Sequence, residues 1–313
     1  MPPPSSSARY APVEGWGIAW ITFAFGLGLA LALAAGAQAR TEHDGPPRLV
    51  SLNPSLTAIV VRIGAGDQLV GIDDYSARIV PELGDRPRVG GLFDPSLEAV
   101  MALRPDRVLL VAGVEQDTHA AALRHLGLAV EVFENERYEQ VLGNIERLGR
   151  LTGHGTAARE RIEAIRATRA AVEQVTHGRA RPGTVIVLDR SPLYLVGGET
   201  FLDELLEAVG ATNLGAEVAT GYPRGSLEWL VAARPELLLD LSPQSEAGDA
   251  LDFWQRWPSL PAVATGRVLT LDATRVSLPG PDLDRALREL AEAVHGRAIG
   301  AAIDRALAGR ATP

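Results

Sequence analysis

Residues 96–106 read SLEAVMALRPD, and residues 226–236 read SLEWLVAARPE. Each stretch predicts a helix that is followed directly by the apolar run of a buried strand. A second matching pair, Ile63-Gly64-Ala65 and Val209-Gly210-Ala211, closes the first helix of each half. Because the two pairs occur in the same order, the chain contains an internal repeat, and we expect two similar halves.

Strand-like and helical stretches alternate on both sides of these repeats. Apolar or β-branched runs lie at 48–52, 68–72, 107–112 and 129–133 in the first half, and at 184–188, 237–241 and 268–271 in the second. Predicted helices lie at 56–63, 96–103, 118–126, 200–209, 227–233 and 283–294. This alternation predicts parallel sheets covered by helices on both faces. We therefore expect an α/β fold with two Rossmann-like lobes that have parallel sheets.

A long helical stretch separates the two halves. Residues 138–177 show no strand signal, and residues 156–174 contain neither Gly nor Pro. We expect a long backbone α-helix at 151–178, between an N-terminal α/β lobe at 48–150 and a C-terminal α/β lobe at 179–313. Two facing lobes leave a cleft, and ligands of such sheets bind beyond the carboxyl ends of the strands.

The N-terminus carries an export signal. Residues 18–36 are apolar and uncharged, and Ala37-Gln38-Ala39 follows them as a small-x-small cleavage signal. This pattern predicts a secretory signal peptide at 1–39, cleaved after Ala39, and a linker at 40–47. The apolar run nearly spans a bilayer, so a retained N-terminal anchor stays open. Either alternative places the body in the periplasm, soluble or anchored.

Composition excludes several classes of protein. The 313 residues contain no Cys, which excludes disulfides, thiolate metal sites, Cys nucleophiles and a lipidated cysteine. A net charge of −9 without a basic stripe argues against nucleic-acid binding. We find no nucleophile-base-acid arrangement, zinc motif or phosphate loop. The sequence therefore predicts a protein that is not an enzyme and has no resident metal or cofactor.

Several further motifs carry a resemblance to a known family. They are RLVSLNPS at 48–55, Gly64-Ala65-Gly66-Asp67, the two Ser-Leu-Glu helices, WPSLPAV at 257–263 and Gly266-Arg267-Val268. Over about residues 48–297 the chain resembles the periplasmic solute-binding proteins of ABC importers for cobalamin, haem and ferric siderophores. The resemblance implies a monomer with a helical backbone that clamps a metal chelate between its lobes and delivers it to the permease.

The resemblance also assigns a role to one glutamate of each half. Glu98 and Glu228 stand where the family has the acidic residues that dock onto arginines of the permease. The alternative is that each glutamate only stabilises the dipole of its own helix.

Four aromatic residues are the candidate ligand contacts in the cleft. The resemblance places Tyr75, Phe93 and Tyr222 at aromatic cleft positions, and Tyr194 follows a predicted strand. Flat aromatic side chains suit a corrin or porphyrin ring, because they offer large rigid contact area. The alternative for each is ordinary packing of a loop. If the ligand were haem, its axial ligand would come from Tyr75, Tyr194 or Tyr222, since His119 is better explained as an ordinary helix residue.

The charge of the last cleft loop bears on the ligand. The family's arginine after Pro279-Gly280-Pro281 is replaced by Asp282, which makes an anionic ferric siderophore less favoured. Arg275, Arg190 or Arg224 could substitute for it, and the alternative for each is that it is solvated or paired. Arg275 is the candidate we place in the cleft. We expect a corrinoid, with haem or a ferric siderophore as alternatives. A membrane-anchored sensor and a metal chelatase are the less favoured classes.

Overall fold

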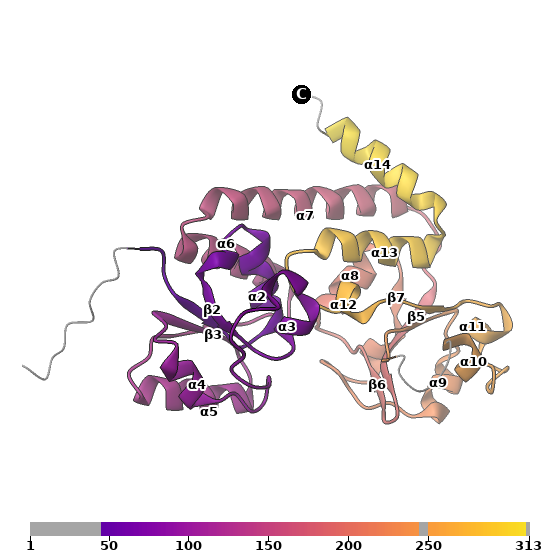
Figure 1. Cartoon of the computed structure of the whole chain (residues 1–313). Helices are drawn as coiled ribbons and strands as arrows, with labels where there is room; N and C mark the ends of the chain where they lie inside the picture. Colours follow the sequence, from indigo (N-terminus) through magenta and orange to yellow (C-terminus); the bar gives the residue numbers. More distant parts are fainter. Residues whose placement is uncertain (1–44, 244–249, 311–313) are drawn as a thin grey trace, which may run out of the picture. The chain divides into compact units, whose positions relative to one another are not determined.

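The computed structural model describes residues 45–243 and 250–310, so the predicted signal peptide and most of the predicted linker lie outside the described residues. The first half contains a parallel sheet in the order β2-β1-β3-β4 (Figure 1). Its strands are β1 (Leu49–Ser51), β2 (Leu69–Ile72), β3 (Arg107–Val111) and β4 (Val130–Phe133). The four strands predicted for this half are confirmed.

The second half contains a sheet in the order β6-β5-β8-β9, with β7 beside β5. Its strands are β5 (Gly183–Arg190), β6 (Leu193–Leu195), β7 (Thr212–Asn213), β8 (Leu237–Asp240) and β9 (Val268–Thr270). The pairings of β5 with β7 and β8, and of β8 with β9, are parallel, whereas β6 is antiparallel to β5. The hairpin that joins β5 to β6 was not predicted. Tyr194 lies within β6, whereas the sequence predicted that it follows a strand.

Helices cover these sheets. Those of the first half are α2 (Pro54–Arg62), α3 (Ser76–Ile79), α4 (Leu97–Ala102), α5 (Val114–His125) and the 3-10 turns η1 (Gly66–Gln68) and η2 (Pro81–Leu83). Those of the second half are α8 (Phe201–Ala208), η3 (Leu214–Glu217), α9 (Leu227–Ala233), α10 (Ala250–Trp254), α11 (Pro261–Ala264), α12 (Ala273–Val276), α13 (Leu283–His295) and α14 (Ala298–Arg310). In the part of the chain that the structure describes, none of the helices is both long and apolar enough to cross a membrane.

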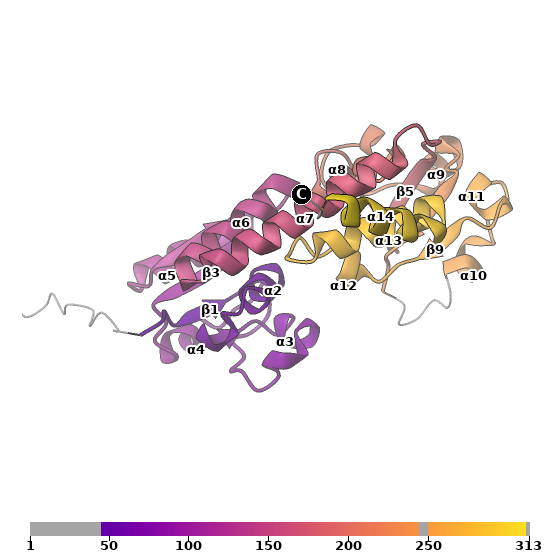
Figure 2. The same ribbon diagram turned by 90° about the horizontal axis from the view of Figure 1, so that it is seen from above.

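Two helices occupy the stretch between the halves. α6 (Tyr138–Thr152) ends at Gly153, whose left-handed φ of 77° a glycine adopts without strain. α7 (Gly155–Thr176) follows; its 22 residues make it about 33 Å long. It packs against α6 on one side and against α8, α13 and α14 on the other (Figures 1 and 2). A long helix therefore contacts both halves, as predicted.

The repeat in the sequence is also a repeat in the structure. Ser96 Oγ accepts a hydrogen bond from Ala99 N at 3.2 Å, and Ser226 Oγ accepts one from Trp229 N at 3.1 Å. Both helices are followed by an arginine with positive φ, Arg104 at 47° and Arg234 at 49°. A proline follows each arginine and disfavours the right-handed helical region for it, which ends the helix.

The buried core continues from one half to the other. A single cluster of buried apolar side chains includes Leu49 and Ile59 of the first half, Ile165 of α7, and Phe201 and Leu287 of the second. Separate clusters lie on the other face of each sheet. Because interiors are close-packed, this shared core resists separation of the halves beside α7.

Candidate functional site

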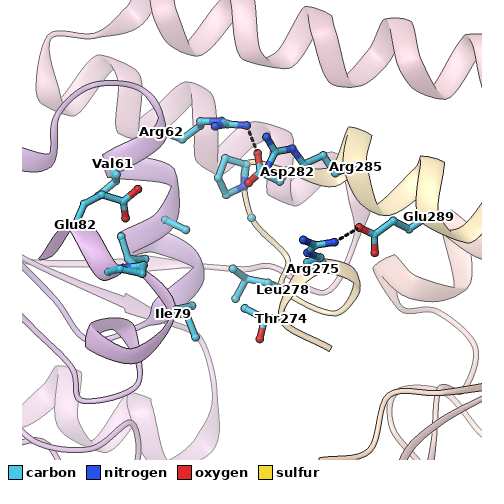
Figure 3. A pocket seen from close by; sticks show the side chains of 15 residues that line it. Val61, Arg62, Ile79, Glu82, Thr274, Arg275, Leu278, Asp282, Arg285 and Glu289 are labelled. Carbon is cyan, nitrogen blue, oxygen red and sulfur yellow. Dashed lines mark hydrogen bonds and ion pairs between the residues drawn. The ribbon is translucent and has the colours of Figure 1, made fainter. Parts of the chain in front are cut away.

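A pocket of about 600 Å³ lies between the two halves (Figure 3). α2, α3 and η2 line it from the first half, and α12, the loop after it and α13 line it from the second. The carboxyl ends of β2 and β9 lead into α3 and α12, so the pocket lies where a ligand of facing parallel sheets is expected. Its apolar lining is Ala58, Val61, Ile79, Val80, Pro81 and Leu278.

The charges that line this pocket balance. Three arginines, Arg62, Arg275 and Arg285, face three acids, Glu82, Asp282 and Glu289. Two of the arginines are paired within the lining: Arg62 with Asp282 at 2.5 Å, and Arg275 with Glu289 at 3.2 Å (Figure 3). The pocket thus offers no net positive charge to an anionic ligand.

Arg275 is the one predicted ligand contact that lines this pocket. Its side chain is 66% exposed, and a second carboxylate, that of Asp272, lies 3.6 Å from its Nε. Two carboxylates therefore offset its charge. Asp282 is engaged as well, because its carboxylate accepts a hydrogen bond from Arg62 of the other half.

The four predicted aromatic contacts lie outside the lining of this pocket: Tyr75, Phe93 and Tyr222 are on loops, and Tyr194 is in β6. Tyr75, Phe93, Tyr194 and Tyr222 are 43%, 65%, 40% and 44% exposed. They make up four of the nine large apolar side chains that are exposed in the described residues. More than half of each tyrosine is covered, so these rings pack in part on their neighbours and also present a face to solvent.

Backbone contacts join the segments that carry these aromatics in pairs, one pair in each half. Asp74 N donates to Gly90 O at 2.9 Å, so the loops that carry Tyr75 and Phe93 adjoin in the first half. In the second half Tyr194 forms an isolated antiparallel bridge with Arg224, two residues after Tyr222.

Asp73 holds the backbone of Tyr75. Its carboxylate is fully buried and accepts hydrogen bonds from the N–H groups of Tyr75 and Ser76, each at 2.9 Å, and from Ser76 Oγ. Burial raises the pKa of Asp73, although these hydrogen bonds lower it in part. Asp73 is therefore a structural residue of the loop.

Tyr222 has a protonated phenol. Although 44% of the residue is exposed, burial of the phenol raises its pKa to about 12, and the negative charge of Glu136 contributes in the same direction. Glu136 lies between β4 and α6. The charge of Glu136, at the border of the first half, therefore acts on the phenol of Tyr222 in the second half.

Glu98 and Glu228 occupy equivalent places at the start of α4 and α9. Each lies in the first turn of its helix and is exposed. Within the described ranges, neither carboxylate has a basic group at ion-pair distance. Hydrogen bonds from its own backbone N–H and from Ser226 lower the pKa of Glu228. Each half thus presents one acidic side chain that has no ion-pair partner among the described residues.

A sequence profile of the periplasmic binding protein family matches residues 49–274. The chain belongs to this family. Its members bind solutes and catalyse no reaction, so the prediction of a protein that is not an enzyme is confirmed.

Three relatives show which members of the family this chain is similar to. The vitamin B12-binding protein of Vibrio parahaemolyticus is 26% identical over 253 residues, which cover 78% of this chain and 88% of that protein. An ABC transporter substrate-binding lipoprotein of Bacillus subtilis is 26% identical over 265 residues, 80% of each chain. A solved periplasmic haem-binding protein from Pseudomonas aeruginosa is 29% identical, with a TM-score of 0.67 over 80% of this chain and 93% of that one. The resemblance inferred from the sequence is confirmed, and the chain is an ABC substrate-binding protein of the class that includes B12, haem and iron-chelate binders.

One alternative for the ligand site of this periplasmic binding protein is wrong. Arg190 was a candidate for meeting an anionic ligand, but its side chain is 5% exposed and its Nε lies 2.8 Å from the fully buried carboxylate of Asp240. Asp240 also accepts from Trp254 Nε1 at 2.6 Å, and the Arg190 guanidinium stacks over Phe253 at 4.8 Å. Arg190 is therefore part of the interior.

Other features of the binding protein were missed. Val114 is 89% exposed and begins α5, four residues before the predicted start of that helix. Glu115 and Asp117 in the first turn are the helix-start signal that could have shown this earlier start. The Arg62–Asp282 pair was missed because its partners are 220 residues apart, a separation that no local pattern covers.

Proposed function

We propose that this chain captures a corrinoid between its two halves and delivers it to the permease of an ABC importer. The observation that carries the proposal is the set of four exposed aromatics, two on adjoining segments of each half. Flat rings that remain exposed without a ligand can stack on a corrin face, and they order few torsions when they do. Arg275 lines the neighbouring pocket and would meet a polar side group of the ligand.

Charge balance favours a corrinoid over an anionic chelate. Haem carries two propionate carboxylates, and many ferric siderophores are anionic, so a site for either benefits from unpaired cations. Here Arg62, Arg190 and Arg275 each lie at ion-pair distance from a carboxylate. The amide side chains of a corrinoid need only neutral donors and acceptors.

Haem is the second candidate, because a solved haem-binding protein is 29% identical to this chain.

Delivery rests on Glu98 and Glu228. Their equivalent positions, exposure and lack of ion-pair partners among the described residues fit docking onto basic residues of a permease. A role confined to the dipole of each helix would leave the shared position unexplained. We further propose that the chain is exported through residues 1–39, acts as a monomer in the periplasm, and is either cleaved after Ala39 or anchored there.

The ligand is tested by titration of the purified exported chain with cyanocobalamin, cobinamide, haemin and a ferric hydroxamate. We expect the corrinoids to bind and to quench tryptophan fluorescence. Binding of haemin or the hydroxamate in the absence of corrinoid binding would refute the ligand while leaving the class intact.

Delivery is tested with a Glu98→Arg/Glu228→Arg variant in cells that lack the wild-type chain. We expect normal corrinoid binding and loss of corrinoid uptake. The matched control is Glu160→Arg/Glu163→Arg, which makes the same change in net charge on the exposed face of α7. Full uptake by the first variant would remove the docking role.

A further inference from the structure

The exposed aliphatic side chains of this chain gather on the two glutamate helices. Beyond the four aromatics, five large apolar side chains are exposed in the described residues. Three of the five lie on α4 or α9: Met101 is 39% exposed, and Leu227 and Val231 are each 36% exposed. Scattered exposed aliphatics need no explanation, but here three of five lie on two short helices already marked by equivalent acids.

Met101 and Val231 occupy the same position in the repeat. Each is the fifth residue after the capping serine, Ser96 or Ser226, and each is the third after the glutamate. Residues three apart on a helix lie on one face, so Met101 is a neighbour of Glu98 and Val231 is a neighbour of Glu228. Each half therefore presents one acid and one aliphatic side chain side by side.

The aliphatic side chains add an apolar contribution to docking that the acids cannot supply. An exposed charge pair contributes about 0–1 kcal/mol and is screened by salt. Apolar area removed from water contributes about 25 cal/mol per Å², and this contribution does not fall with screening. A contact that combines both is steered by charge and held by apolar burial.

We infer that Glu98 with Met101, and Glu228 with Val231 and Leu227, form a two-part docking surface. The inference rests on the proposed delivery function. Its partner is the permease, which would offer a basic residue beside an apolar recess at two equivalent places. A lipid surface fits less well, because the acids would be repelled by anionic headgroups.

The test uses right-side-out membrane vesicles from the source organism, prepared from cells without this chain, and protein-free anionic phospholipid vesicles. The variant is Met101→Gln/Val231→Thr, which keeps side-chain size and makes both positions polar. The control is Leu126→Gln, which alters an aliphatic side chain that is 46% exposed at the end of α5. Co-sedimentation is measured from about 50 mM to about 500 mM salt, over which the Debye length falls to about 4 Å. Corrinoid titration of each variant verifies that it is folded.

We expect the double variant to bind membrane vesicles about tenfold more weakly than wild type, as for the loss of a central apolar contact. At high salt the wild type keeps residual binding that this variant lacks, while Leu126→Gln behaves as wild type. Equal binding by wild type and the double variant at every salt concentration would overturn the aliphatic contribution alone. Wild-type binding to the protein-free vesicles would overturn the choice of partner. Absence of wild-type binding to membrane vesicles would instead refute delivery itself.

Discussion

Arg62 of α2 donates a hydrogen bond to the carboxylate of Asp282, just before α13, at 2.5 Å, and this ion pair joins the two halves at the rim of the pocket (Figure 3). Both side chains are partly exposed, at 38% and 39%. The sequence carries Asp282 where the resemblance would place an arginine. The structure shows why an acid serves there: the facing half supplies the cation.

A double-mutant cycle measures this contact. We expect Arg62→Gln and Asp282→Asn to show a coupling of about 0.5 kcal/mol in urea unfolding, because water screens pairs that are this exposed. The coupling should fall as salt is raised. Exchange of the charges, Arg62→Asp with Asp282→Arg, should restore part of it. A coupling that is unchanged in high salt would contradict an electrostatic contact.

The buried pair in the second half should behave asymmetrically. Asp240→Ala leaves Arg190 buried without a counter-charge and should destabilise the protein by about 3–5 kcal/mol. Arg190→Met should cost about 1–2 kcal/mol, since Asp240 keeps its donors Trp254 and Ser242. Nη1 and Nη2 of Arg190 have no hydrogen-bond partner among the described residues, so their removal leaves no partner there unsatisfied. Urea unfolding should show the larger loss of free energy for Asp240→Ala. Equal losses in the two variants would contradict this asymmetry of the ion pair.

Sequence patterns predicted most of the fold because its elements are locally encoded. The copies at 96–106 and 226–236 showed two halves, and the Gly- and Pro-free stretch at 156–174 showed the helix that contacts both. β6 was missed because three residues give too little alternation, and α14 because its apolar residues follow no single helical face.

The candidate site could be predicted only in part. The resemblance to the family singled out Tyr75, Phe93 and Tyr222, and Tyr194 was singled out because it follows a predicted strand. Whether an arginine is free or paired depends on residues far away in the sequence. Arg190 and Asp240 are 50 positions apart, and Arg62 and Asp282 are 220 apart. Of the candidate cations, Arg190 and Arg275 are paired with carboxylates in the fold, whereas Arg224 is exposed and has no ion pair among the described residues.

His295 links stability to pH. Its Nε2 donates to Val209 O at 2.7 Å, while burial lowers its pKa below the ordinary value of 6.5, helped by the charges of Arg179 and Arg267. The folded state thus binds its proton less readily than the unfolded state. Stability should fall as the pH drops from about 6.5 through the lowered value, because the unfolded state takes up the proton first.

A variant isolates this contribution. His295→Gln should remove part of the decline in the urea midpoint between neutral and mildly acidic pH, since Gln can still donate a hydrogen bond and carries no titrating proton. The control is His125→Gln, at the exposed end of α5. If both variants retain the wild-type profile, His295 does not account for the acid sensitivity.

The aromatic contacts should contribute to corrinoid affinity one by one and across the two halves. Tyr75→Ala, Phe93→Ala, Tyr194→Ala and Tyr222→Ala should each weaken binding by about 5- to 50-fold, the range for loss of a stacked ring. Phe93→Ala should leave the urea midpoint nearly unmoved because its side chain is 65% exposed, and the three tyrosine variants should lower it only modestly. Asp73→Ala should weaken binding as well, but with a loss of stability, because it frees the backbone of Tyr75 without touching the ligand. Isothermal titration beside urea unfolding separates the two effects. A ligand that used only one half would leave affinity unchanged in the variants of the other, which would contradict capture between the halves.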